Sequence, residues 1–524
     1  MARSAVGVPL PVLSLTSLTT IAVLGPAAPG RVSPAAAATP TAATPAVDWT
    51  FPADEATLKD VARSIRADTA YDQGYTGKGV GVALIDTGVL PIPGLTSGNV
   101  VNGPDLSIES QIPGLYQKDG YGHGTHMAGI IAGRDSINGT GFRGIAPDAK
   151  LTSIKVGAAD GAVDVSQMLA AIDWVVKHRN DDPANPIRVL NLSYGTDGLQ
   201  SRDIDPLVHA AQTARKAGLL VVVAAGNNGA TARVSNPAID RYALVVGASH
   251  HKGTTQPLDD TVSSFSSLGD GDRMVDVLAP GRSIVSLRAP GSYIDTNFPT
   301  ARVGDRYFKG SGSSEAAAVV SGAAALLFQR WPTARPQDFK GMFQSRSTYL
   351  PNATGRDLGY GGELDLAKML GSALVEAKTQ TWTPSLGTGT LQGARGTAAI
   401  TFGSDPLKLT GEIDIFGLPF NTAAWAAAST AGTSWQGGYW MGRSWTGTGW
   451  ATSADGMASW TGRTWSGRTW SGRTWSSLAW SGRTWSGRTW SSAGYGPTPA
   501  WSGATWQGAS WSSSSRTTGW LLGA

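Results

Sequence analysis

The apolar residues of the chain gather in short runs that predict buried strands and helices in alternation. Residues 80–85 carry no polar side chain, which is typical of a strand covered on both faces. Residues 123–132 are small and mostly apolar, and they predict a buried helix that begins at His123. Residues 314–329 are rich in alanine and contain no proline, which predicts a helix with Ser314 at its N-terminus. Asp86 stands at the C-terminal end of the predicted strand, where open α/β sheets build their sites.

The first part of the chain has a different composition. After Arg3 a largely apolar stretch runs to four consecutive alanines, and we expect residues 1–38 to be a secretory signal peptide. Residues 39–54 are rich in proline, alanine and threonine, which predicts a linker. A first helix is predicted over residues 55–66. The chain contains no cysteine, so disulfides are excluded.

Three short segments, far apart and each beside glycines, carry the residues of a nucleophilic site. Asp86 follows the run 80–85, His123 lies in a Gly-His-Gly-Thr-His sequence, and Ser314 lies in Gly-Ser-Ser-Glu. A serine hydroxyl needs a base to remove its proton, and histidine has a suitable pKa. A buried carboxylate holds such a histidine in one tautomer. We therefore assign Ser314 as the nucleophile, His123 as the general acid–base and Asp86 as the group that orients His123.

Each segment has an ordinary structural explanation when it is taken alone. Asp-Thr-Gly can end a strand, a lone histidine is most often structural, and Gly-Ser-Ser forms flexible loops. Together, in the order Asp86, His123 and Ser314, they resemble the subtilisin-like serine proteases, or subtilases. Chymotrypsin-like enzymes and α/β-hydrolases have a different order. The resemblance implies a subtilisin-like three-layer fold with a mostly parallel central sheet, and a peptidase domain over residues 55–375.

The resemblance also implies an oxyanion hole and a substrate groove. Asn227 follows a buried run and would donate its side-chain amide to the oxyanion, with the backbone amide of Ser314 as the second donor. An ordinary Asn-Gly turn is the alternative explanation. Residues 193–195 would pair with the substrate backbone as an added strand. The expected walls of the pocket are small and uncharged, so we expect it to accept bulky apolar side chains. The wall residues are Ser193, Tyr194, Gly195, Ala224, Ala225 and Gly226.

Two residues depart from the family pattern. Glu315 stands directly after the nucleophile, where the family usually has an uncharged residue such as methionine. A carboxylate there could oppose the oxyanion if it points inward, and the milder interpretation is that it points to solvent or to a cation. Ala318 replaces a usual proline, which straightens the start of the helix at little chemical cost. For His126, one turn after His123, we expect a structural role.

The predicted chemistry requires no cofactor and no metal. Calcium is common among subtilases, and residues 134–144, with Asp135 and Asn138, resemble one family calcium loop in position. Their oxygens form no recognisable ligand set, so a structural calcium stays open. Most secreted subtilases carry a folded pro-domain, and too few residues lie between positions 38 and 55 to form one. We expect folding without a cleaved inhibitor domain.

The composition changes again after residue 375. Strand-like pieces at 398–402 and 407–416 predict a small β-rich module over residues 376–424. Residues 425–524 form a repetitive Trp/Gly/Ser-rich tail whose commonest unit is Trp-Ser-Gly-Arg-Thr. A five-residue spacing gives no stripe of indoles on a helix and alternates them on a flat strand. A four-sided β-solenoid and a disordered tail both stay open. The tryptophans in one five-residue register are Trp425, Trp435, Trp440, Trp445, Trp450, Trp460, Trp465, Trp470, Trp475, Trp480, Trp485 and Trp490.

The tail has a net positive charge that exceeds that of the whole chain. From residue 425 onward it has seven arginines and one aspartate, whereas the whole chain has a net charge of +4. Interleaved arginine and tryptophan favour a cell wall, a polysaccharide or a membrane surface as partner. A spacer without a ligand is the alternative. We expect no nucleic-acid partner, because a secreted chain seldom meets one.

These features predict a secreted or cell-surface serine endopeptidase that acts on proteins or peptides. The presence of Asp86, His123, Ser314 and Asn227 favours this function. The alternative is a catalytically weak or inactive subtilase-like surface-binding protein whose repeat tail is the main functional part. Glu315 and the lack of room for a pro-domain favour that alternative.

Overall fold

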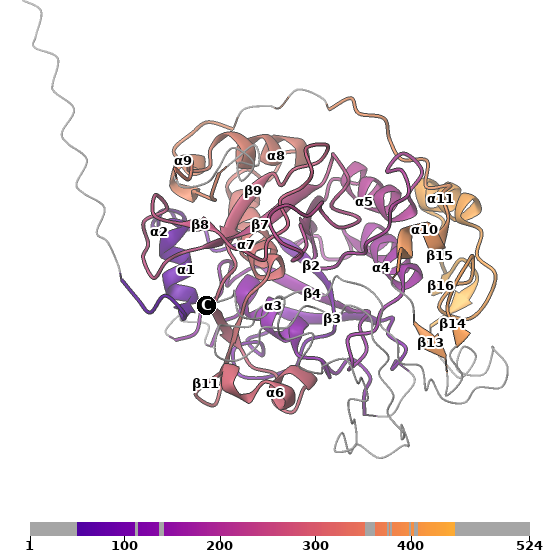
Figure 1. The fold of residues 1–524 in the computed structure, drawn as a ribbon, viewed down its shortest axis with the longest axis horizontal. Helices are drawn as coiled ribbons and strands as arrows, with labels where there is room; N and C mark the ends of the chain where they lie inside the picture. Colours follow the sequence, from indigo (N-terminus) through magenta and orange to yellow (C-terminus); the bar gives the residue numbers. More distant parts are fainter. Residues whose placement is uncertain are drawn as a thin grey trace, which may run out of the picture. The chain divides into compact units, whose positions relative to one another are not determined.

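An eight-stranded sheet lies at the centre of the described chain (Figure 1). Its strands follow the order β3-β4-β2-β5-β6-β7-β8, and β9 pairs with β7. The pairing is parallel except between β7 and β8. The predicted α/β class with a mostly parallel sheet is therefore confirmed. The strands are β2 (Gly81–Asp86), β3 (Val100–Asp105), β4 (Lys150–Lys155), β5 (Ile187–Leu192), β6 (Leu220–Ala224), β7 (Leu244–His250), β8 (Thr261–Val262) and β9 (Val277–Pro280).

The structure is a computed structural model, and all its described residues belong to one of two units of the chain, Asp48–Ala524. The predicted signal peptide lies outside the described residues, as do most of the predicted linker and the tail from residue 446 onward. Within the described part, no helix combines the length and apolar character needed to cross a membrane. The described residues are 50–445, except 111–113, 136–140, 352–361, 375–376, 378–379, 398–399 and 403–406.

Successive side chains of β2 enter two different hydrophobic cores, as the pleat of a strand requires. Val82 and Leu84 belong to one core, and Ala83 and Ile85 belong to the other. Both faces of the strand are therefore dry. This explains why its sequence shows no alternation of apolar and polar residues.

Helices cover both faces of the sheet and complete three layers. α3 (His123–Ala132) and α7 (Ser313–Arg330) pack together in one core. α4 (Val165–His178) and α5 (Pro206–Lys216) pack together in the other core (Figure 1). Helix α3 begins where it was predicted to begin, and α7 begins one residue earlier than predicted.

The first helix is shorter than the predicted span 55–66. β1 (Ala56–Thr57) pairs with β10 (Ile284–Leu287), and α1 (Leu58–Ser64) begins only after it. Thr57 closes a capping box at the start of α1, which satisfies backbone N–H groups that have no partner in the helix. The remaining elements of this part are α2 (Asp68–Asp72), α6 (Tyr293–Asn297), a 3-10 turn (Pro299–Ala301), β11 (Arg302–Val303), β12 (Tyr307–Gly310), α8 (Pro336–Ser345) and α9 (Leu366–Leu370).

The C-terminal elements pack on the side of α4 and α5 (Figure 1). Arg395, at the end of α10, donates from Nε to Oδ2 of Asp164 at 2.6 Å, and both side chains are buried. Asp164 caps α4, so this ion pair ties the C-terminal elements to the peptidase core. The elements are α10 (Leu391–Arg395), β13 (Thr401–Phe402), β14 (Leu407–Lys408), α11 (Thr422–Ala431), β15 (Trp435–Gln436), β16 (Tyr439–Trp440) and β17 (Arg443–Ser444).

Strands β15 and β16 contain Trp435 and Trp440, the first closely spaced members of the tryptophan register, and Trp445 directly follows β17. Trp435 and Trp440 are cross-strand partners in an antiparallel pair, so their indoles share one face, and both are buried. The loops Gly437–Gly438 and Met441–Gly442 have positive φ at all four residues, as two-residue hairpin turns of type I′ require. The members of the register from Trp450 onward lie outside the described residues.

Candidate active site

Asp86 and His123 are hydrogen-bonded to each other in the interior. Asp86 ends β2 at the carboxyl edge of the sheet, where open α/β folds place their sites, and His123 begins α3. His123 Nδ1 lies 2.8 Å from Asp86 Oδ1 and 3.0 Å from Oδ2, and both side chains are fully buried. Burial opposes a charge on the imidazole, but the charge and hydrogen bond of Asp86, together with the charges of Glu315 and Asp119, outweigh that effect and raise the pKa of His123. This is the geometry of a base that is oriented by a carboxylate.

Close backbone contact brings these two segments together. A Cβ on Gly124 would lie 2.1 Å from the carbonyl oxygen of Gly88, which leaves room only for glycine. The N–H of Gly124 donates to Thr87 Oγ1 at 2.9 Å, and the N–H of Thr87 donates to Asp86 Oδ1 at 2.7 Å. The glycine in each sequence thus allows the acid and the base to meet.

Asp119 is a buried carboxylate that the sequence analysis missed. Its Oδ1 accepts hydrogen bonds from Thr87 Oγ1 at 2.9 Å and from Gly122 N–H at 2.6 Å. Its Oδ2 accepts from the N–H and Oγ1 of Thr125 at 2.8 and 2.6 Å. These bonds join the loop before His123 to the first turn of α3 and to the end of β2. The available signal was a carboxylate four residues before the base in a glycine-rich loop.

Ser314 lies in the first turn of α7 and lines a pocket. The N-terminus of a helix favours the negative charge that develops during attack by a serine. The Ser314 carbonyl oxygen accepts from Ser193 Oγ at 3.3 Å. The pocket combines the predicted nucleophile, the predicted oxyanion donor and five of the six predicted wall residues. Its lining residues are Ser193, Tyr194, Gly195, Ala224, Gly226, Asn227, Ser235, Ser313 and Ser314.

Ala225 is the predicted wall residue that does not line this pocket. Its N–H donates to the carbonyl oxygen of Val246 at 2.9 Å, and its own carbonyl accepts from the N–H of Ser235 at 3.0 Å. Its neighbours Ala224 and Gly226 line the pocket instead, because successive residues of an extended segment face opposite sides.

Asn227 is held in place by Ser313, which the sequence analysis also missed. Asn227 Oδ1 accepts from the N–H of Ser313 at 2.8 Å, and Ser313 Oγ accepts from the N–H of Gly226 at 3.1 Å. The amide is therefore fixed through its oxygen, and its NH₂ group is the end that can serve as a donor to a ligand. The loop after β6 and the N-terminus of α7 form one unit.

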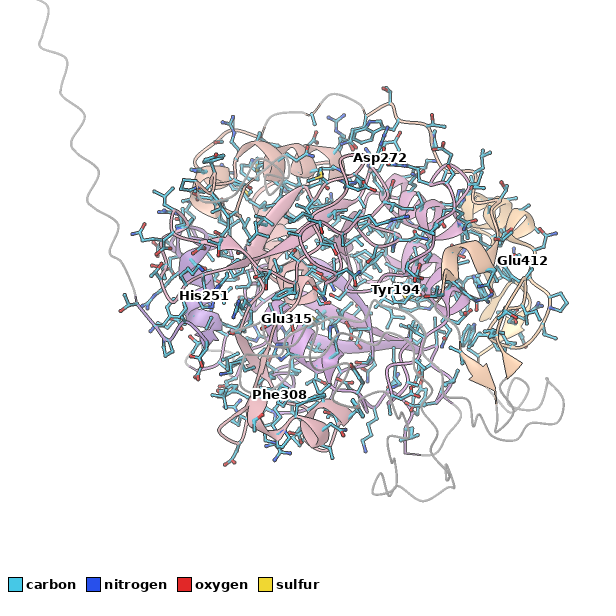
Figure 2. All side chains as sticks on the ribbon, in the orientation of Figure 1. Tyr194, His251, Asp272, Phe308, Glu315 and Glu412 are labelled. Atoms are coloured by element: carbon cyan, nitrogen blue, oxygen red, sulfur yellow. The ribbon has the colours of Figure 1, made fainter. Side chains whose placement is uncertain are left out.

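Glu315 points inward, the first of the two orientations that the sequence left open, and it does not face solvent. Its side chain is fully buried (Figure 2), and Oε1 lies 3.8 Å from Nε2 of His126. Among the described residues, neither carboxylate oxygen has a hydrogen-bond partner outside Glu315 itself. Burial raises the pKa of this carboxyl to about 7, against the opposing attraction of His123. The side chain is buried because the first turns of α3 and α7 meet around it.

The predicted calcium loop is only partly described. Asp135 forms an ion pair with Arg306 and accepts from the N–H of Phe142 at 2.7 Å. Asn138 lies outside the described residues. Within the described ranges, no group of three or more histidine and carboxylate side chains is placed to hold a metal ion. A structural calcium stays a prediction.

Comparison with known proteins identifies the family to which the chain belongs. The model of the subtilase family, Peptidase_S8, matches residues 77–361, more than half of the chain. The chain belongs to the subtilase family. Residues 77–361 form its subtilase-family domain.

Several known proteases are similar to this chain over half of its length or more. Serine protease AprX of Bacillus subtilis (strain 168) is 38% identical over 279 residues, which are 52% of this chain and 62% of AprX. Subtilisin BL of Lederbergia lenta is 34% identical over 270 residues, which are 51% of this chain and 83% of that protein. A solved protease structure from Pseudoalteromonas arctica PAMC 21717 has 26% identity and a TM-score of 0.49, over 60% of this chain and 97% of that one. The chain thus spans less than two thirds of AprX.

Proposed function

We propose that this subtilase is a secreted serine endopeptidase that cleaves peptide bonds with Asp86, His123 and Ser314, and with Asn227 as an oxyanion donor. The Asp86–His123 hydrogen bond of 2.8 Å is the observation that carries the proposal. It lies at the carboxyl edge of β2. Because β2, β5 and β6 run parallel, the pocket of Ser314 and Asn227, which follows β5 and β6, belongs to the same edge.

The proposed reaction begins when Ser314 Oγ attacks the carbonyl carbon of the scissile bond. His123 takes the hydroxyl proton, and Asp86 stabilises the resulting imidazolium. Collapse of the tetrahedral intermediate breaks the C–N bond, and His123 gives its proton to the leaving amine. A water molecule then attacks the acyl-enzyme in the same way and releases the acid and free Ser314.

Negative charge develops on the carbonyl oxygen in both steps. In the proposed mechanism this oxygen receives hydrogen bonds from the NH₂ group of Asn227 and from the backbone N–H of Ser314. The bond from Ser313 N–H to Asn227 Oδ1 supports this role, because it orients the amide before the substrate arrives. Donors fixed in advance need no reorganisation in the transition state.

The pocket walls suggest which residue precedes the scissile bond. Ser193, Gly195, Ala224 and Gly226 are small and carry no charge, so we propose that a bulky apolar side chain is preferred. A peptide library that varies only this position tests the preference. Equal cleavage after acidic, basic and apolar residues would contradict it.

Secretion and surface contact concern segments outside the described residues. We propose secretion from the composition of residues 1–38, and contact with a cell wall, polysaccharide or membrane surface through the tail. The indoles of Trp435, Trp440 and Trp445 are buried. A surface contact through the register would therefore use its later members.

Active-site labelling tests the enzymatic part of the proposal. A fluorophosphonate probe should label the wild-type chain and should not label Ser314→Ala. Ser321→Ala is the matched control, because Ser321 is a buried serine on the same helix that donates to Asn191 Oδ1 at 2.8 Å. Labelling that survives in Ser314→Ala, or that is absent from folded wild-type protein, would contradict the assignment.

One observation favours the second candidate, a weakly active surface-binding protein. Glu315 places a buried carboxyl directly beside the residue whose backbone N–H would bind the oxyanion. The variant Glu315→Met restores the residue type usual in the family. Its rate of peptide hydrolysis, compared with that of wild type, distinguishes the endopeptidase from the surface-binding protein. A gain from no detectable activity to ready hydrolysis would favour the second candidate.

A further inference from the structure

Glu315 is a buried carboxylate without the hydrogen-bond donors that usually surround one. It is fully buried, and among the described residues its oxygens have no hydrogen-bond partner outside the residue itself. Buried carboxylates usually accept several hydrogen bonds, as Asp119 does in this chain. A carboxylate that stabilises only the fold would be expected to have such donors.

The titratable groups around Glu315 come from α3 and from the end of β2. His126 is the nearest, with Nε2 at 3.8 Å from Oε1. Burial and the charge of His123 lower the pKa of His126 well below its ordinary value. His126 is thus neutral at physiological pH, and it offers Glu315 no positive charge.

His123 is the cation that Glu315 can influence. Burial opposes a charge on His123, whereas Asp86, Glu315 and Asp119 each favour it and raise the pKa of the imidazole. The attraction is mutual, because His123 in turn favours the ionised form of Glu315, while Asp86 disfavours it. In a dry interior such an attraction acts over several ångströms without direct contact.

We propose that Glu315 is a positioning residue that acts on His123 through its charge, as a second carboxylate beside Asp86. Ionised Glu315 stabilises the imidazolium form of His123. His123 therefore becomes a neutral base only at a higher pH than it would without that charge. The inference rests on the proposed function, because His123 is the general base of that function. It assigns a role to the residue in which this chain departs from the usual subtilase pattern.

The sign of the effect follows from the charges. Glu315→Gln keeps the shape of the side chain and removes its negative charge, so the imidazolium loses a stabilising partner and the pKa of His123 falls. The acid limb of the kcat/KM profile should therefore move to lower pH, by about half a unit or more. Glu315→Met should move it in the same direction, because both variants remove the charge although their shapes differ.

The experiment compares kcat/KM from about pH 5 to pH 10 for wild type, Glu315→Gln and Glu315→Met, with a chromogenic peptide amide. Glu363→Gln is the matched control, since Glu363 is also buried and bonds to Ser249. Its acid limb should coincide with that of wild type. The proposal would be overturned if the acid limb of kcat/KM lay at the same pH in both Glu315 variants as in wild type, whatever the maximum value of kcat/KM. Glu315 would then have only a packing role.

A second measurement keeps this inference separate from the proposed function. Histidine imidazole signals can be titrated by NMR in Ser314→Ala and in the double variant with Glu315→Gln, and the chain has only six histidines. The His123 signal should titrate at lower pH in the double variant. If wild type cleaves no peptide, the proposed function fails, and the NMR titration still decides whether Glu315 acts on His123. An unchanged His123 titration would overturn the inference.

Discussion

The indole Nε1 of Trp425 donates a hydrogen bond of 2.8 Å to Oδ2 of Asp173, a residue 252 positions earlier in the chain. The same Oδ2 accepts from Nε1 of Trp440 at 2.9 Å, and Oδ1 accepts from Ser429 Oγ at 2.6 Å. Asp173 lies on α4, inside the peptidase layer. The beginning of the tryptophan register is thus part of the peptidase core.

Loss of this acceptor should destabilise the protein. Asp173→Ala would leave three buried donors without a partner, and we expect a loss of about 3 kcal/mol or more in the free energy of unfolding. Denaturant unfolding measures it. Lys177→Ala, an exposed change on the same helix, should cost little.

A chain that ends at residue 375 should likewise unfold at a lower temperature than one that ends at residue 445. Equal stability of those two chains would contradict a shared core.

The oxyanion role of Asn227 can be separated from its structural role. Asn227→Asp keeps an oxygen that can accept from Ser313 N–H, and it replaces the NH₂ donor by a charged oxygen. We expect kcat to fall by about 10²- to 10³-fold, the usual loss of one oxyanion donor in a serine protease, with a smaller change in KM. Asn228→Asp introduces the same charge one residue later and should have a much weaker effect. A similar fall in both variants would point to general electrostatics instead of a donor.

Much of the framework was predictable because it depends on local sequence. Short segments with strong residue preferences predicted three features: the buried strand β2, the starts of α3 and α7, and the order Asp86, His123, Ser314. The roles of Asp119 and Ser313 were missed, because each depends on partners in other segments. Both are ordinary polar residues until the loops around them have folded.

Two features depend on packing between distant segments. From the sequence, Glu315 could point inward, or it could point to solvent or to a cation. Only the packing of α3 on α7, whose sequences lie far apart, encloses it. The tryptophan spacing matches neither a single helix nor a single flat strand, and from the sequence a four-sided β-solenoid and a disordered tail both stay open. The described part of the register forms hairpins of two-residue strands. Their two-residue turns lie at Gly437–Gly438 and Met441–Gly442. Neither the helical nor the strand periodicity describes this arrangement.

The pH dependence of the wild-type enzyme follows from the Asp86–His123 pair. His123 must be neutral to act as a base, and the Asp86 carboxylate raises its pKa above the ordinary value of 6.5. A raised pKa keeps the imidazole protonated to higher pH, so the acid limb of kcat/KM should lie above pH 6.5. Asp86→Asn should reduce kcat by about 10³- to 10⁴-fold, because the tautomer is no longer fixed. A wild-type limb at or below the ordinary histidine value would argue against the coupling.

Gly226 sets the width of the pocket. Its φ is +105°, and a Cβ would lie 2.5 Å from Ser235 Oγ across the lining. Gly226→Ala should therefore reduce kcat/KM for a substrate with phenylalanine before the scissile bond by about tenfold more than for one with alanine there. Gly218→Ala is the matched control, since Gly218 has a φ of +94° and no atom within 4 Å of the added Cβ. Both variants should lose about 1–2 kcal/mol of stability through backbone strain, but only the first should change selectivity. If the two variants cleave the phenylalanine and alanine substrates in the same ratio, the pocket that Gly226 lines does not hold the side chain before the scissile bond.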